Sequence, residues 1–137
     1  MTRYAALMLV ASCLAGCGGV GAKTEPTTPA TLTPAQWSAV QDGVRGALKD
    51  PESARFGAYQ AVRSLGPDGA IIVCGRVNAK NSHGGYTGEL PYGGMLAEIG
   101  PNAEVRKFTP FGVASVGKNG DIGVYMACKK YGINIDA

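Results

Sequence analysis

The sequence predicts an α+β fold in which an N-terminal amphipathic helix packs on an antiparallel β-sheet, with one disulfide. Three observations lead to this expectation: a capped helical pattern that begins at residue 33, alternating apolar runs between turn signals, and two cysteines far apart in the chain. The composition agrees, because 21 glycines and an aromatic content of 7% favour a turn-rich sheet over a helical bundle.

Residues 1–16 predict a signal peptide of the lipoprotein kind. Arg3 supplies the positive start, and the apolar run 5–14 has about half of the ~20 residues that a membrane-spanning helix needs. Leu14-Ala15-Gly16-Cys17 is similar to the bacterial lipobox, and this resemblance implies cleavage before Cys17 and attachment of acyl chains, such as palmitate, to Cys17. An ordinary secretory signal with an incidental cysteine is the alternative.

The mature chain is then expected to be held at a membrane by a linker. Gly18 follows Cys17 where retention in the inner membrane would favour Asp, so we expect the outer membrane, facing the periplasm. Residues 17–31 have too little apolar surface to fold and predict a flexible linker, which leaves 32–137 as a single domain. Loss of Arg3 lowers the formal charge from +3 to +2, and no long basic run predicts binding to nucleic acid.

The first element of the domain is a helix with clear end signals. Thr33 is a good N-cap, Pro34 suits the first helical position, and Gln36 completes a capping-box pattern. Pro51 ends the helix at 48–50. The apolar residues share one face at helical spacing: Trp37, Val40, Val44, Ala47 and Leu48.

The middle of the chain predicts a hairpin and two short strands. Residues 50–53 predict a turn capped by Asp50, and 55–63 predict a strand. The turn signal 65–69 leads into the central strand from Ala70, which is the most apolar β-branched run of the domain. Short strands are expected at 95–99 and 105–108.

The C-terminal part predicts a second hairpin, with strands at 111–117 and 122–128. Asn119-Gly120 between alternating apolar runs is a strong hairpin signal. On this interpretation Ile122, Val124, Met126 and Cys128 share the face that points to the core. In the mature chain Cys74 and Cys128 remain as an even pair in an oxidising compartment, which predicts a disulfide between them.

Two stretches carry a resemblance to known proteins. Lys49-Asp50-Pro51-Glu52-Ser53-Ala54-Arg55-Phe56 and Val73-Cys74-Gly75-Arg76-Val77-Asn78-Ala79-Lys80-Asn81-Ser82-His83-Gly84-Gly85-Tyr86-Thr87-Gly88 resemble a group of small uncharacterised bacterial envelope lipoproteins. The resemblance implies placement in the envelope and a fold, and it carries no activity. The group often has an aromatic residue where this chain has His83, which argues against an essential imidazole.

The chemistry-bearing residues favour binding over catalysis. A Cys74 nucleophile activated by His83 would need an exposed thiolate, whereas Cys74 lies in an apolar strand with a disulfide partner. Metal binding by Cys74, His83 and Cys128 lacks the compact ligand spacing of zinc sites. We therefore expect no enzyme activity, no cofactor and no metal.

The polar loop 78–88 is the expected binding site. Its candidate residues offer directional hydrogen bonds and one charge: Asn78, Lys80, Asn81, Ser82, Tyr86 and Thr87. A purely structural loop, in which Asn and Gly satisfy unusual backbone angles, is the alternative. Residues 82–86 are also similar to the inserted loop of lipoprotein inhibitors of lysozyme, which are all-β barrels. The expected partner is therefore an envelope protein, a cell-wall component or a cell-wall-degrading enzyme.

Overall fold

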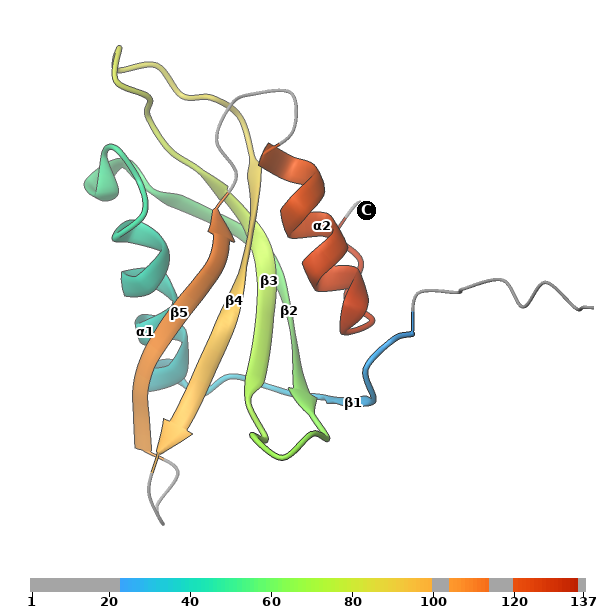
Figure 1. Ribbon diagram of the computed structural model, residues 1–137. Coiled ribbons are helices and arrows are strands. Elements are labelled where there is room, and N and C mark those ends of the chain that lie inside the picture. The colour runs from blue at the N-terminus through green and yellow to red at the C-terminus, as the bar shows by residue number, and fades with distance from the viewer. Residues whose placement is uncertain (1–22, 100–103, 114–119, 136–137) are drawn as a thin grey trace, which may run out of the picture.

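The structure, a computed structural model, describes residues 23–99, 104–113 and 120–135. The elements follow in the order β1 (Thr27–Pro29), α1 (Pro34–Arg45), the short 3-10 helix η1 (Pro51–Ser53), β2 (Arg55–Ser64), β3 (Ile71–Asn78), β4 (Leu90–Ile99), β5 (Glu104–Val113) and α2 (Gly120–Lys130). The five strands form one antiparallel sheet in chain order, and α1 and α2 cover opposite faces of it (Figure 1). The α+β class and the antiparallel sheet are thus confirmed. The expected signal peptide and Cys17 lie outside the described residues.

Helix α1 begins as its sequence predicts. The Thr33 hydroxyl accepts a hydrogen bond from the Gln36 amide at 3.2 Å, and the Gln36 side chain accepts one from the Thr33 amide at 2.8 Å. This reciprocal pair satisfies two of the backbone donors that a helix start leaves open. The regular helix ends at Arg45, a few residues before the predicted end, and one further turn follows it.

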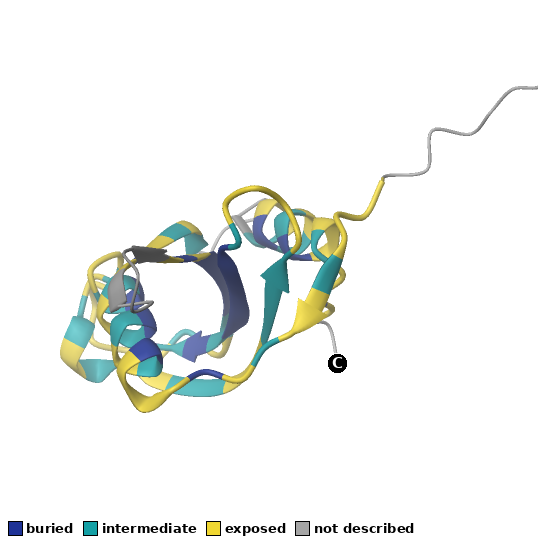
Figure 2. Cartoon of the chain, turned by 90° about the horizontal axis from the view of Figure 1, so that it is seen from below, coloured by how far each residue is buried: buried dark blue, intermediate teal, exposed yellow. Residues whose placement is uncertain are grey.

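The main core lies between α1 and the sheet. Val40 and Val44 of α1 and Ile71, Val73 and Val77 of β3 are all buried, and Leu32, Tyr92, Leu96 and Phe108 complete this cluster. Viewed along the strands, the buried residues gather in the middle of the sheet and on the inner side of the helix (Figure 2).

Glycines in β4 and α1 make room for Phe108. A Cβ on Gly94 would meet the Phe108 ring, and a Cβ on Gly43 would lie 2.8 Å from that ring. This packing explains why β4 starts at Leu90 and not at Met95 as predicted: residues 90–94 have poor β propensity, but their glycines admit the bulky side chains of β5.

A buried tyrosine hydroxyl lies in the same core. The Tyr92 side chain has no exposed surface, and no hydrogen-bond partner for its hydroxyl is found among the described residues. Burial, with a smaller contribution from Tyr59, raises the pKa of the Tyr92 phenol above its usual range.

The hairpin of β2 and β3 is confirmed, and part of the segment expected to be a flexible linker forms a strand. Strands β2 and β3 pair from Arg55↔Asn78 to Arg63↔Ile71. Thr27–Pro29, expected within the flexible linker 17–31, forms edge strand β1 and pairs with residues 62–64 of β2. The backbone amide of Glu25 also donates to the Lys130 carbonyl at 2.8 Å. The ordered part of the chain therefore begins before residue 32.

The predicted strand at 122–128 is wrong, because Gly120–Lys130 forms helix α2. Val124 and Cys128, four residues apart, are buried against the sheet, whereas Ile122 and Met126 are 59% and 63% exposed. The alternation of apolar residues therefore does not mark a common core face. Of the partner strand predicted at 111–117, residues 111–113 belong to β5 and 114–117 lie outside the described residues.

Helix α2 ends in a glycine-based cap. Gly132 has a φ of +73°, its amide donates to the Lys129 carbonyl, and the Ile133 amide donates to the Cys128 carbonyl. This is the Schellman pattern, with Gly at the left-handed position and the next residue returning to the last helical turn.

The disulfide between Cys74 and Cys128 is present, and it joins β3 to α2. A smaller core surrounds it, formed with Ile72, Val124, Ile133 and Ile135. Residues 131–135 after α2 are hydrogen-bonded to β2 and β3. The Arg76 guanidinium donates to the Ile135 carbonyl at 2.6 and 3.1 Å, and the Gln60 side-chain carboxamide donates to the Asn134 carbonyl at 2.8 Å.

Candidate functional site

The predicted binding loop is a small hairpin between β3 and β4. Lys80 and Tyr86 form an isolated antiparallel bridge, and the Asn81 amide donates to the Gly85 carbonyl at 2.8 Å. Gly84 and Gly88 have φ values of +79° and +88°, a conformation that glycine adopts at little cost. The loop therefore has a defined shape built from local hydrogen bonds.

A second segment supports the base of this hairpin. Asp50 caps η1, as predicted, with its carboxylate accepting from the Ser53 amide at 3.3 Å. The Ser53 hydroxyl donates to the Asp50 carbonyl at 2.8 Å and accepts from the Lys80 amide, also at 2.8 Å. The two stretches that carry the resemblance, 49–56 and 73–88, thus contact each other.

Tyr86 is the most prominent side chain of the loop. Tyr86 is 39% exposed, with the Arg55 guanidinium 4.3 Å and the Lys80 ammonium 5.7 Å from the ring centroid. Both distances allow cation–π attraction, which orients the ring without removing it from solvent. We call Arg55, Lys80 and Tyr86 the Tyr86 cluster.

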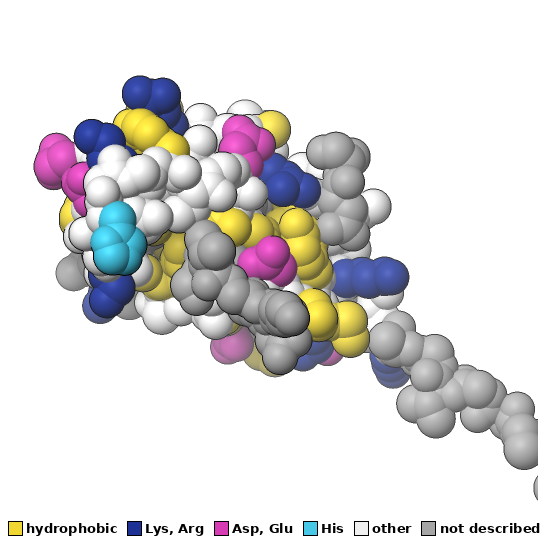
Figure 3. Space-filling view, turned by 90° about the horizontal axis from the view of Figure 1, so that it is seen from above, with side chains coloured by type: hydrophobic (Ala, Val, Ile, Leu, Met, Phe, Trp, Pro, Cys, Tyr) yellow, Lys and Arg dark blue, Asp and Glu magenta, His cyan; other side chains and the backbone are white. Residues whose placement is uncertain are grey.

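Arg55 is a site residue that the sequence reasoning missed. It is the first residue of β2 and lies opposite Asn78 in the register of β2 and β3. Antiparallel pairing that sets the first residue of one predicted strand opposite the last residue of the other would have placed Arg55 beside the loop. The imperfect alternation of residues 55–63 did not predict this register. At this end of the molecule, Lys and Arg side chains lie close to hydrophobic side chains (Figure 3).

The other predicted loop residues divide between structural and exposed positions. The Asn81 carboxamide oxygen accepts from the amides of His83 and Gly85, and the Thr87 hydroxyl donates to the Ala79 carbonyl at 3.4 Å. Ser82 is exposed at the tip. Asn78 is half-buried, and no donor among the described residues reaches its side-chain oxygen. Asn81 and Thr87 therefore hydrogen-bond within the hairpin, whereas no such side-chain bond engages Lys80, Ser82 or Tyr86 among the described residues.

An apolar pocket of about 190 Å³ adjoins the loop. It lies between the end of α1 and the ends of β3, β4 and β5, and Lys49 and Lys80 are among its lining residues. The apolar wall is formed by Ala47, Leu48, Val77, Ala79, Leu90 and Val113. A cationic loop and an apolar pocket thus lie side by side.

The structure does not bring Cys74 and His83 together as a catalytic pair. Cys74 is fully buried and bonded to Cys128, so it offers no thiolate, and His83 is exposed in the loop. Across residues 23–99, 104–113 and 120–135, no three His, Cys, Asp or Glu side chains are placed to share a metal ion.

Residues 23–99, 104–113 and 120–135 also contain no helix that is long and apolar enough to cross a bilayer.

Comparison of the chain with protein-family models, with curated proteins and with solved structures finds no match to any of them.

Proposed function

We propose that the protein is a lipid-anchored lipoprotein of the bacterial envelope, attached to the outer membrane through Cys17, and that it binds a partner with its loop 78–88. The observation that carries this proposal is the exposed Tyr86 side chain with Arg55 and Lys80 near its ring. Tyr and Arg are enriched among the residues that dominate binding energy at protein interfaces. A ring that is already oriented loses little conformational freedom when a partner covers it.

The position of the loop supports this role. Strand β1, where the chain enters the fold, pairs with residues 62–64 of β2, while Arg55 at the other end of β2 lies beside Asn78. A strand of ten residues spans about 33 Å, so the Tyr86 cluster lies far from the entry of the linker (Figure 1). A tether on the N-terminal side would therefore hold the loop away from its point of attachment.

The chemistry of the site supports one kind of partner. Arg55, Lys49 and Lys80 favour acidic groups, and the pocket beside them accepts an apolar side chain. The partner we propose is an envelope protein that presents an apolar side chain next to carboxylates.

A photo-cross-linking experiment in cells tests this proposal, with a photoreactive phenylalanine analogue in place of either Tyr86 or Tyr59. Tyr59 is the matched control, because it is 38% exposed against 39% for Tyr86 and stacks on Trp37 at a centroid distance of 4.4 Å. We expect a discrete protein adduct from position 86 that Arg55→Glu abolishes, and none from position 59. The same adducts from both positions, or adducts that Arg55→Glu leaves unchanged, would refute the binding role of the loop.

A second candidate function is inhibition of a cell-wall-degrading glycosidase. Such enzymes place two carboxyl groups in the catalytic cleft, and two cations, Arg55 and Lys80, lie beside the exposed Tyr86 ring of the loop. Titration of lysozyme with the mature protein tests this candidate. Inhibition that weakens at least about tenfold with Tyr86→Ala or Ser82→Ala would support it, since a contact worth ~1.4 kcal/mol changes affinity by that factor. Activity that stays constant at saturating protein would exclude it.

A further inference from the structure

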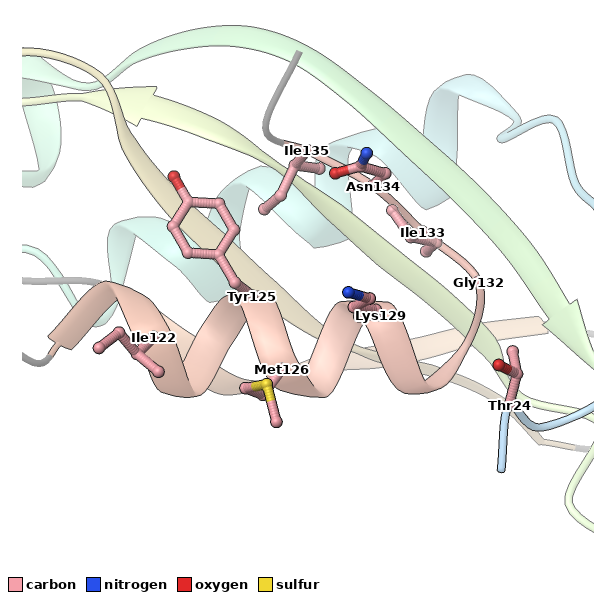
Figure 4. Close-up of a pocket in the computed structure, with 9 residues that line it drawn as sticks. All are labelled: Thr24, Ile122, Tyr125, Met126, Lys129, Gly132, Ile133, Asn134 and Ile135. Carbon is pink, nitrogen blue, oxygen red and sulfur yellow. The ribbon is translucent and has the colours of Figure 1, made fainter. Parts of the chain in front are cut away.

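A large cavity lies on the opposite side of the sheet from α1. It is an open groove of about 510 Å³ between α2 and the segment 131–135 that returns along it (Figure 4). Tyr125, Ile133 and Ile135 form its inner side, and Ile122 and Met126 project from α2 at its outer rim (Figure 4). The groove is therefore mainly apolar.

Two apolar side chains at the outer rim of the groove are exposed to solvent. Ile122 and Met126 are 59% and 63% exposed, whereas Val124 and Cys128 of the same helix are buried. Residues 122, 126 and 129 follow helical spacing, so Lys129 extends the same stripe with a positive charge. This face of α2 therefore presents two apolar side chains and a lysine to the solvent.

The entry of the chain lies at this groove. Thr24 is one of its lining residues, and the Glu25 amide is bonded to the last residue of α2, Lys130. Only seven residue steps separate Cys17 from Thr24, and seven steps of extended chain span at most about 25 Å. A lipid on Cys17 would therefore keep the groove within that distance of the bilayer.

The charges near the groove suit an anionic lipid surface. Lys129 lines the groove and Lys23 is exposed next to Thr24. Lys130 lies 3.6 Å from the Glu25 carboxylate, so that pair carries no net charge. Juxtamembrane lysines are attracted by phosphatidylglycerol and similar headgroups.

We propose that the groove face of α2 rests on the membrane to which Cys17 is attached, with Ile122 and Met126 inserted among the headgroups. This inference builds on the proposed lipid attachment. Insertion of two side chains is weak alone, but the tether supplies the high effective concentration that makes it persistent.

The test uses the mature chain coupled through the Cys17 thiol to a maleimide-bearing lipid in vesicles of phosphatidylethanolamine and phosphatidylglycerol. Brominated acyl chains quench tryptophan fluorescence on contact. Ile122→Trp reports the groove rim, and Leu65→Trp is the matched control. Leu65 is 60% exposed, and its amide donates to the Pro26 carbonyl, so it also lies near the chain entry. The signal of Trp37 is subtracted with the unsubstituted protein.

We expect brominated lipid to quench the Ile122→Trp fluorescence at least about twice as strongly as the Leu65→Trp fluorescence. A further Met126→Asp substitution should return the quenching of Ile122→Trp to the level of the control. Equal quenching at both positions would overturn the proposal. A change in Ile122→Trp emission that depends on protein density and not on bromination would also overturn it and indicate a second copy of the chain at the groove.

Chemical coupling keeps this test independent of lipidation in the cell. If the intact protein purified from membranes carries no acyl chains on Cys17, the proposed anchor fails, whatever the vesicles show. If the anchor is present but Ile122→Trp is not quenched, only the seating of α2 fails.

Discussion

Reduction of the Cys74–Cys128 disulfide should lower the free energy of unfolding by about 4 kcal/mol. The bond closes a loop with a sequence separation of 54, and the chain-entropy relation gives this value for a loop of that length. Domains of this size are typically stable by about 5–15 kcal/mol, so the reduced protein should retain a much smaller margin. Reduction leaves both sulfur atoms in the core, so the change in unfolding free energy measures the loss of the covalent constraint and not a loss of packing.

Urea unfolding with and without reductant measures this difference. Trp37, the one tryptophan of the chain, stacks on Tyr59 in the α1 layer, so its fluorescence reports loss of the main core. With a denaturant slope of about 2 kcal/mol per molar urea, the midpoint should fall by about 2 M. The variant with both Cys74→Ser and Cys128→Ser is the control, because its unfolding should not respond to reductant.

A difference below about 1 kcal/mol between the oxidised and reduced proteins would refute the loop-closure reasoning. Loss of helical circular dichroism well before the Trp37 transition would refute the assumption of one cooperative unit. It would show that α2 detaches from β3 while the main core stays folded.

Three further predictions concern the core and the helix start. Gly94→Ala should destabilise the fold by about 1–3 kcal/mol in urea unfolding, because a Cβ there would meet the Phe108 ring. Gly123→Ala is its control, since among the described residues no heavy atom beyond its chain neighbours and the backbone of its own helix lies within 4 Å of the new Cβ. This substitution should stabilise α2 by up to ~1 kcal/mol, and a loss of stability would show that the new methyl group meets a steric clash. Tyr92→Phe should stabilise the protein by about 1 kcal/mol near neutral pH, because it removes a buried hydroxyl that has no hydrogen-bond partner among the described residues. Above pH ~10 the unfolded chain releases the Tyr92 proton before the folded protein does. The free energy of unfolding of the wild-type protein should therefore fall relative to that of Tyr92→Phe by about 1.4 kcal/mol per pH unit. Parallel pH profiles of the two proteins would contradict the raised pKa. Thr33→Ala should cost about 1 kcal/mol of unfolding free energy by loss of the capping box, and an unchanged denaturation midpoint would contradict that role.

Helix α1 could be predicted from the sequence because its signals are local. Thr33, Pro34 and Gln36 act within one turn, and the buried Val40 and Val44 follow the period of the helix itself. The turn at Asp50 and the β2–β3 hairpin are local in the same sense. In each case, contacts between residues close in sequence determine the structure.

Helix α2 was missed because alternation was given more weight than end signals. Apolar residues at 122, 124, 126 and 128 fit a period of two, and Asn119-Gly120 fits a hairpin turn. The helical signals were nevertheless present: Asp121 in the first turn, Lys129 in the last turn, and Gly132 beyond it. Because this segment is a helix, Ile122 and Met126 form an exposed rim, whereas the strand interpretation placed both side chains on the core face.

The site could be predicted in part. The abrupt change from an apolar strand to a polar, glycine-rich segment located the loop, but its main contacts come from elsewhere in the chain. Arg55 and Ser53 reach the loop through the register of β2 on β3, which depends on the packing of the whole sheet. Composition alone could not separate Asn81, which holds the hairpin together, from Tyr86, which projects from it.

The order of the strands also bears on how the protein folds. From β2 to β5 each strand pairs with its neighbour in the chain, so every hairpin can form by closing a short loop. Contact between β3 and α2 requires a much longer closure and should form after the sheet has assembled. Interactions formed after the rate-limiting step slow unfolding more than they speed folding. The covalent link between Cys74 and Cys128 should therefore act mainly by lengthening the lifetime of the native state.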